Sequence, residues 1–406
     1  MKKTCLLKLI VIVSLFLLCT NCRKTNKSFD VPDADRQLDR ITEKYALLCN
    51  LVTLENNTLT SRFPRSLKID GSLRMVGPSD WSSGFYPGIL WMIYDYSQDE
   101  KWKDQAIRFT GYLEDQKYNT SGHDIGIKMM SSYGKAFRQT GEMGYFVVLE
   151  EAARSLSARF NSELGCIASW NDPDKLRTFP VTIDNLMSLE LLTWAFKQTG
   201  DQVYMNIVNS HAHLTMKEHI RSNNSVCQVV DFDPVSGSVI SRKNRHGAAE
   251  NSDWARGQAK AVYGFTLLYE ATQKPEYLET AEQLANYYLN HPNMPEDKIP
   301  YWDLKAPGIP DEPRDASAAA IMASALIDLS RLSEKNNRYH QLAVEMIQTL
   351  SSPAYFNLPG NKQPFLIRHV TISKPDTLEV DSSSVMADYF YLEALLKLRK
   401  NLKETS

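Results

Sequence analysis

The sequence predicts an all-α protein, an (α/α)6 barrel of six helical hairpins, on three observations. Apolar residues recur at helical spacing in about twelve segments, short turns of similar composition join these segments in pairs, and long loops separate the pairs. The twelve segments are 33–54, 84–97, 101–115, 126–140, 143–160, 183–199, 201–221, 255–273, 275–290, 316–333, 336–351 and 384–401. Strand signals are sparse, and only 226–232 and 364–372 alternate as small hairpins do.

The short turns carry a degenerate internal repeat. Each joins one helix to the next and places an aromatic residue in the first turn of the second helix. They are 97–102, 140–145, 199–204, 272–277 and 333–339. An open helical solenoid would share these hairpins without the closure. We favour the barrel, because six hairpins with short turns at one end and long loops at the other describe it.

The long loops place the functional site. Segments 161–182, 222–253, 291–315 and 352–383 are rich in Gly, Pro, Asp and Trp. Loops of that length are uncommon in a compact domain, and on one rim they usually form a site. The inner helices begin at this rim, so their first residues converge there.

Acidic residues stand at several of these helix starts. Asp and Ser there are ordinary N-caps, and that explanation suits Asp315, Asp381 and Ser382. Asp124 and Asp184 are set among apolar or aromatic residues, which a solvated cap does not require. We interpret them as paired carboxylates. Two such groups in a closed site push their pKa values apart, so that one holds a proton near neutrality while the other stays ionised.

The same rim is rich in tryptophan, which suggests carbohydrate chemistry. Flat indole faces suit the apolar sides of pyranose rings, although core packing explains any single tryptophan equally well. The four are Trp81, Trp170, Trp254 and Trp302. Arg256, at the start of the eighth segment, is the candidate for bidentate pairing with a sugar carboxylate.

Composition and motifs exclude several other functions. The chain has 46 basic and 48 acidic residues, so no global field attracts nucleic acid. His211 and His213 face different sides of one helix, and the pair His123-Asp124 lacks a second histidine at ligand spacing. Neither a Gly-rich phosphate loop nor a Gly-x-Ser-x-Gly elbow occurs. We therefore predict hydrolysis with no metal and no cofactor.

The N-terminus predicts export. Lys2 and Lys3 precede an apolar run over 6–18, which is typical of a secretory signal and too short for a comfortable membrane span. We assign 1–22 to the signal and 23–406 to a single catalytic barrel. Cys22 is a candidate lipid acceptor, although Asn21 is larger than the small residue usual before it. Two locations stay open, free in the periplasm or attached to the membrane by a lipid.

Motifs along nearly the whole mature chain resemble those of glycoside hydrolase family 88, the unsaturated glucuronyl hydrolases. They are His123-Asp124-Ile125-Gly126, Thr182-Ile183-Asp184-Asn185-Leu186-Met187, Leu191-Leu192-Thr193-Trp194-Ala195, Trp254-Ala255-Arg256-Gly257-Gln258-Ala259, Pro300-Tyr301-Trp302-Asp303, Pro313-Arg314-Asp315-Ala316-Ser317 and Ala387-Asp388-Tyr389-Phe390. The resemblance also implies an (α/α)6 barrel.

The resemblance implies an activity. Asp184 matches the catalytic acid/base and Asp124 its partner. The substrate is the 4,5-unsaturated glucuronic acid that polysaccharide lyases leave at a non-reducing end, here on glycosaminoglycan oligosaccharides. Asp184 protonates C4, water adds at C5, and the resulting hemiketal opens and expels the next sugar, so the spacing rule for ordinary glycosidases does not apply. The residues predicted to bind substrate are Trp81, His123, Trp170, His246, Trp254, Arg256 and Lys260.

Three positions depart from the family pattern. Lys260 stands where tryptophan is expected, Gln228 where the pattern has histidine, and His246 where it has glutamine. A lysine in place of a stacking ring predicts a sulfated or otherwise anionic leaving sugar. Two other functions stay open: an unsaturated rhamnogalacturonyl or other uronyl hydrolase, and a non-catalytic glycan-binding protein. The pair of acids argues against the second.

Overall fold

The computed structural model describes residues 29–55, 62–171 and 178–404. Internal contacts separate Met1–Asp30 from Val31–Ser406, and the second unit holds every element named below. The predicted signal, Cys22 and the predicted boundary at 22/23 lie outside the described residues. Among the described helices, none combines the length and the apolar character that a membrane span requires.

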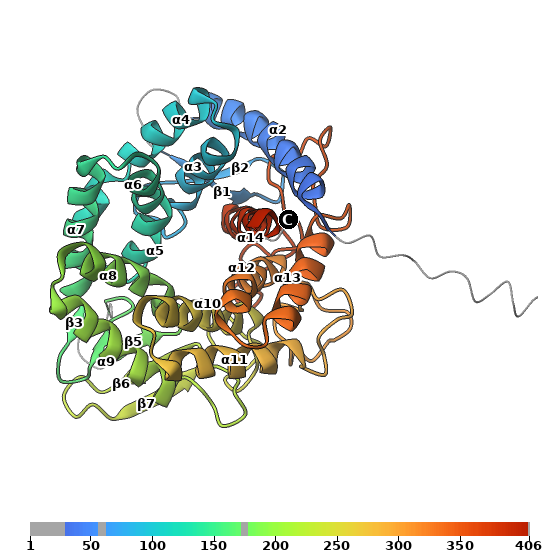
Figure 1. The fold of residues 1–406 in the computed structure, drawn as a ribbon. Coiled ribbons are helices and arrows are strands. Elements are labelled where there is room, and N and C mark those ends of the chain that lie inside the picture. Colours follow the sequence, from blue (N-terminus) through green and yellow to red (C-terminus); the bar gives the residue numbers. More distant parts are fainter. Residues whose placement is uncertain (1–28, 56–61, 172–177, 405–406) are drawn as a thin grey trace, which may run out of the picture. The chain divides into compact units, whose positions relative to one another are not determined.

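The inner helices form a closed ring in Val31–Ser406 (Figure 1). They are α3 (Phe85–Ser97), α5 (Ile125–Met129) continued through a π turn (Met130–Gly134) into α6 (Lys135–Thr140), α8 (Asn185–Thr199), α10 (Ala255–Thr272), α12 (Ala316–Leu332) and α14 (Val385–Glu404). Each packs against the next, and α14 packs against α3. The ring is therefore closed, which confirms the predicted barrel.

The outer ring pairs with the inner one. Its helices are α2 (Val31–Glu55), α4 (Glu100–Gly111), α7 (Met143–Ser157), α9 (Gln202–Glu218), α11 (Pro275–Leu289) and α13 (Asn336–Leu350). The helix α2 packs against α14, so the first described helix covers the last. All twelve predicted segments are helical. Inner helices such as α12 are predominantly apolar and buried almost throughout, as a helix enclosed by others must be.

The short turns share one geometry. Four of them end the inner helix with a residue of positive φ, whose amide donates to the carbonyl four residues earlier at 2.8 Å. These residues are Gln98, Gly141, Gly200 and Gln273. The aromatic residue that follows is buried in most cases, for example Trp102 and Tyr277. The repeat therefore reflects an aromatic ring that packs between the two helices of a hairpin.

The strands lie within the long loops and differ in part from the prediction. The strands β5 (Phe179–Thr182), β6 (Val229–Phe232) and β7 (Val239–Lys243) form one antiparallel sheet in that order. Two further hairpins were not predicted, β1 (Phe63–Leu67) with β2 (Leu73–Val76) and β3 (Phe160–Asn161) with β4 (Cys166–Ile167). The expected hairpin at 364–372 is wrong, because this segment makes only isolated bridges.

A buried carboxylate explains why 364–372 is not a strand. The amides of Leu366 and Ile367 donate to Asp388 of α14 at 2.9 and 3.0 Å, and the Tyr45 hydroxyl of α2 donates to it at 3.0 Å. These amides are consequently unavailable to a ladder. The side chain of Asp388 instead ties the last long loop to α14 and α2.

Two buried histidines on α9 predict acid sensitivity. His211 accepts from the Ile167 amide at 3.1 Å, and His219 donates to the Cys227 carbonyl at 2.9 Å. Burial lowers the pKa of His211 to about 3 and that of His219 to about 4, from an ordinary value of 6.5. The stability they contribute is full above pH 6.5 and is lost as the pH falls through the folded values, because the unfolded chain takes up these protons first.

We expect each histidine to add a slope of about 1.4 kcal/mol per pH unit to the free energy of unfolding over that window. Denaturant titrations at a series of pH values measure it. The variant His211→Asn keeps an acceptor for the Ile167 amide. It should lower the slope by about 1.4 kcal/mol per pH unit, which corresponds to one proton fewer taken up on unfolding. An unchanged slope in this variant would show that His211 is protonated in the folded protein.

Candidate active site

Two acids mark the starts of neighbouring inner helices. Asp124 precedes α5 and Asp184 precedes α8, and these helices pack closely, since a β-carbon at Gly126 would come within 2.4 Å of Ser188. Neither acid caps its own helix, whereas Asp315 accepts from the Ser317 amide at 3.1 Å as an ordinary cap does. The cap explanation therefore holds for Asp315 and fails for Asp124 and Asp184.

Asp184 is held by a lysine. The Lys260 ammonium, on α10, forms an ion pair with the Asp184 carboxylate, and the two side chains are only 12% and 17% exposed. Burial acts to raise the pKa of Asp184, but Lys260, with smaller contributions from His123 and His246, outweighs it and lowers the pKa to about 2. In this arrangement Asp184 is ionised at neutral pH, which does not suit the role of proton donor expected for it.

The surroundings of Asp124 are more open. Its side chain is 39% exposed and lies 3.5 Å from Nε2 of His123. The Nδ1 atom of His123 is 2.9 Å from the Ser169 carbonyl, which can only accept, so Nδ1 is the donor. Ser169 donates in turn to Asn185, the first residue of α8, at 2.7 Å. This network fixes the His123 ring between the two helix starts.

The predicted histidine and glutamine departures form one hydrogen-bonded pair. The Gln228 side chain is 2.9 Å from Nδ1 of His246, and the His246 amide donates to Gln228 at 2.8 Å. Burial and the charge of Arg256 lower the pKa of His246 to about 4, although Asp184 acts in the opposite direction. His246 is thus neutral and close enough to Asp184 for the two groups to interact electrostatically, and its hydrogen bonds with Gln228 hold it in place.

The tryptophans divide into two kinds. Trp81 and Trp170 are half-buried, and Trp170 bridges to Gly122, directly before His123. Trp254 and Trp302 are only 3% and 4% exposed. Trp81 and Trp170 therefore keep part of their surface accessible to a sugar, while Trp254 and Trp302 are packed into the protein.

Cations and a histidine cover the Trp254 ring. Arg256 and Lys260 lie 4.8 and 5.8 Å from its centroid, and His246 meets it edge-on at 5.2 Å. This packing argues against the predicted role of Trp254 as a stacking platform for substrate. Its role here is to support the charged groups around Asp184.

The structure also argues against the predicted role of Arg256. Its guanidinium is buried, forms an ion pair with Asp315, and donates to the carbonyls of Thr371, at 2.8 Å, and Ile372. These donors are occupied and the side chain is only 2% exposed. Arg256 therefore links the last long loop to α10 and α12, and its guanidinium is not available for bidentate pairing with a uronate carboxylate.

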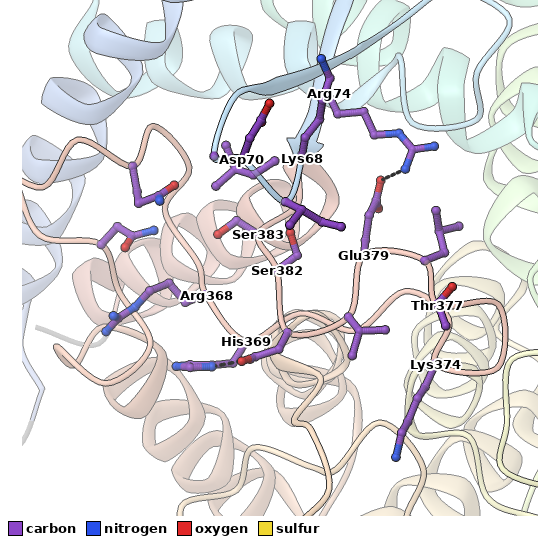
Figure 2. A pocket seen from close by; sticks show the side chains of 18 of the residues that line it. Lys68, Asp70, Arg74, Arg368, His369, Lys374, Thr377, Glu379, Ser382 and Ser383 are labelled. Atoms are coloured by element: carbon purple, nitrogen blue, oxygen red, sulfur yellow. Dashed lines mark hydrogen bonds and ion pairs between the residues drawn. The ribbon is translucent and has the colours of Figure 1, made fainter.

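A cavity of about 1550 Å³ adjoins this loop, between the β1–β2 hairpin and residues 368–383 (Figure 2). Its wall includes Arg74 paired with Glu379 at 3.3 Å and His369 paired with Asp381 at 2.6 Å. Neither predicted catalytic acid lines it. The cavity was not predicted, and the only signal for it in the sequence is the length of the loop at 352–383.

Within the described ranges, no group of three or more His, Cys, Asp or Glu side chains is placed to hold a metal ion. The groups that act electrostatically on Asp184 are the Lys260 ammonium and the imidazoles of His123 and His246. A carboxylate ringed by cationic and imidazole groups suits an anionic substrate.

Comparisons with known proteins place the chain among enzymes of one kind. No protein-family model matches it. An unsaturated glucuronyl hydrolase from Formosa agariphila is 39% identical over 402 residues, which cover 98% of each chain. An unsaturated chondroitin disaccharide hydrolase from Streptococcus agalactiae is 28% identical over 84% of this chain and 86% of the relative. The crystal structure of an unsaturated glucuronyl hydrolase specific for heparin, 39% identical, matches 91% of this chain and 98% of its own with a TM-score of 0.86.

Proposed function

Because this chain belongs to the unsaturated glucuronyl hydrolases, glycoside hydrolase family 88, we propose that Asp124 and Asp184 form its reaction centre. The enzyme removes a 4,5-unsaturated glucuronic acid from the non-reducing end of lyase-generated glycosaminoglycan oligosaccharides. One observation carries the assignment of the centre. Both acids stand at the starts of inner helices that pack together, and neither carboxylate accepts a capping hydrogen bond from its own helix.

The chemistry follows from the enol ether of the substrate. Protonation of C4 by Asp184 leaves positive charge at C5, stabilised by the ring oxygen. The carboxylate then takes a proton from a water that adds at C5. The resulting hemiketal opens to a ketone and expels the neighbouring sugar, so the glycosidic bond breaks without attack at C1. Asp184 thus gives one proton to C4 and gains another from the water, so it is protonated both before and after these steps.

Asp124 and His123 act as the binding side of the centre. The carboxylate of Asp124 is the more exposed of the two acids and faces His123. It suits hydrogen bonds from ring hydroxyls, and a carboxylate placed opposite developing positive charge stabilises it. Trp81 and Trp170 keep accessible edges near the same rim and are the candidates for contact with the sugar ring.

The substrate class is tested by the absorbance of the unsaturated double bond. The relatives are named for glucuronyl, chondroitin disaccharide and heparin substrates, which places glycosaminoglycan disaccharides first. We expect absorbance to fall with lyase-digested hyaluronan, chondroitin or heparin, and the rates rank the substrates. Unchanged absorbance on all three, with loss on a rhamnose-linked fragment, would favour the rhamnogalacturonyl alternative. Binding with no loss on any fragment would favour the glycan-binding alternative.

We propose export for the location. The apolar run over 6–18 and the basic residues before it support a secretory signal, and Cys22 is placed to accept a lipid. Labelled palmitate should enter the wild-type protein and not the Cys22→Ala variant. Label in neither protein, with the enzyme in the periplasmic fraction, would indicate a soluble enzyme, and an enzyme found only in the cytoplasm would contradict export.

A further inference from the structure

Among the described residues, the charged group paired with the proposed catalytic acid is a lysine of another helix. Lys260 lies in the second turn of α10 and pairs with Asp184 at the start of α8. The two helices approach closely, since a β-carbon at Gly264 would come within 2.5 Å of Leu186. Both side chains are largely shielded from water, where an ion pair is strong and the loss of either partner is costly.

This pair conflicts with the first step of the reaction. Protonation of C4 requires Asp184 as a carboxylic acid, and Lys260 favours the carboxylate. The reaction therefore requires that Lys260 leave Asp184 before the proton is delivered. The substrate carries the group that suits this exchange, because an unsaturated uronic acid has a carboxylate beside the double bond.

Two other cations of this rim, which act on Asp124 and His246, are engaged elsewhere. Arg256 is buried with its guanidinium bound to Asp315 and two loop carbonyls. Lys128 donates to the carbonyls of Pro78 and Ser79 at 3.0 Å. Lys260 is thus the described cation whose partner is the catalytic acid itself, and 12% of its side chain remains exposed.

We propose that Lys260 is a positioning residue that exchanges partners, holding Asp184 as a carboxylate before substrate binds and pairing with the uronate carboxylate afterwards. This inference rests on the proposed function. When Lys260 leaves, buried Asp184 takes one proton from solvent. That proton passes to C4, and Asp184 takes a second proton from the water that adds at C5. Asp184 releases this second proton to solvent when the product leaves and Lys260 pairs with it again. In this proposal Lys260 binds the uronate carboxylate, and not a sulfated leaving sugar as the sequence predicted.

The first test compares the unsaturated disaccharide with its methyl ester in each enzyme. In wild type we expect kcat/KM to be at least about tenfold higher for the acid than for the ester, because only the acid pairs with Lys260. In Lys260→Met this ratio should fall to near one. Lys260→Arg keeps a cation and should restore the preference. Because the ratio is taken within one enzyme, it does not depend on the fraction of the variant that is folded.

A matched control removes a lysine paired to an acid far from the site. Lys335 pairs with Glu282 between the outer helices, and Lys335→Met should keep the wild-type ratio. A Lys260→Met enzyme that retains the full preference for the acid would overturn the proposal. Absence of turnover by wild type would instead contradict the proposed function, so the two failures are distinguishable.

The second test uses pH. The titratable groups that act on Asp184 are His123 at the start of α5, His219 on α9, His246 before α10 and Lys260 on α10. In wild type, kcat/KM should begin to fall at a lower pH than kcat, because Asp184 must gain a proton on binding. In Lys260→Met the two profiles should coincide, while the histidines remain in both enzymes. A gap of unchanged size in Lys260→Met would contradict the exchange.

Discussion

The Asp184→Asn variant is expected to lose activity by a factor on the order of a thousand in kcat on an unsaturated glucuronyl disaccharide. An amide cannot protonate C4 and cannot activate the water that adds at C5. The change is nearly isosteric, and the side chain makes no capping bond to α8, so the helix should remain in place. Initial rates of loss of the double-bond absorbance measure the effect.

A matched control is available at another helix start. Asp201 caps α9 by accepting from the Val203 amide at 3.0 Å, and asparagine is an equally good cap. The Asp201→Asn variant should therefore retain wild-type kcat. If Asp184→Asn kept its activity while Asp124→Asn lost it, the two acids would have exchanged roles.

The second large effect is expected in stability and not in catalysis. The Arg256→Leu variant leaves Asp315 as an unpaired buried charge and removes the donors from the Thr371 and Ile372 carbonyls. Removing one partner of a buried ion pair costs about 3–5 kcal/mol. The free energy of unfolding from a denaturant titration should fall by that amount, and KM of the remaining folded enzyme should change little.

The double variant Arg256→Leu/Asp315→Leu separates pairing from packing. Replacing both charges removes the unpaired carboxylate, so part of the lost stability should return relative to Arg256→Leu. A large increase in KM for Arg256→Leu, with no loss of stability, would instead restore the carboxylate-binding role that the sequence predicted.

The helices were predictable because each satisfies a local rule. Apolar periodicity predicts all twelve segments, and the aromatic residues after the short turns are rings that pack between paired helices, most of them buried, as with Trp102 and Tyr277. The small strands were harder to predict, because their pairing depends on distant residues. Segment 364–372 alternates like a strand, yet the amides of Leu366 and Ile367 bind the Asp388 carboxylate.

The positions of the candidate acids were predictable, and their electrostatics were not. Helix order alone brings Asp124 and Asp184 to adjacent helix starts. The partner of a long side chain depends on side-chain geometry, which spacing does not contain. Arg256 consequently reaches Asp315 and two loop carbonyls, and Lys260 reaches Asp184.

One pair of departures could have been predicted together. The sequence has glutamine at 228 where the family pattern has histidine, and histidine at 246 where it has glutamine. The structure places these two side chains 2.9 Å apart. The two departures therefore meet in one hydrogen-bonded pair, which holds the His246 imidazole beside Trp254, 5.2 Å from its ring centroid.

The central claim, that Asp184 delivers a proton to C4 of the unsaturated uronate, is tested most directly by turnover in D2O with NMR of the released keto acid early in the reaction. We expect deuterium at C4 on a single face with the wild-type enzyme and no labelled product with Asp184→Asn. Deuterium spread over both faces would contradict the claim, because it would mean that the glycosidic bond is cleaved first and the freed sugar is protonated in solution.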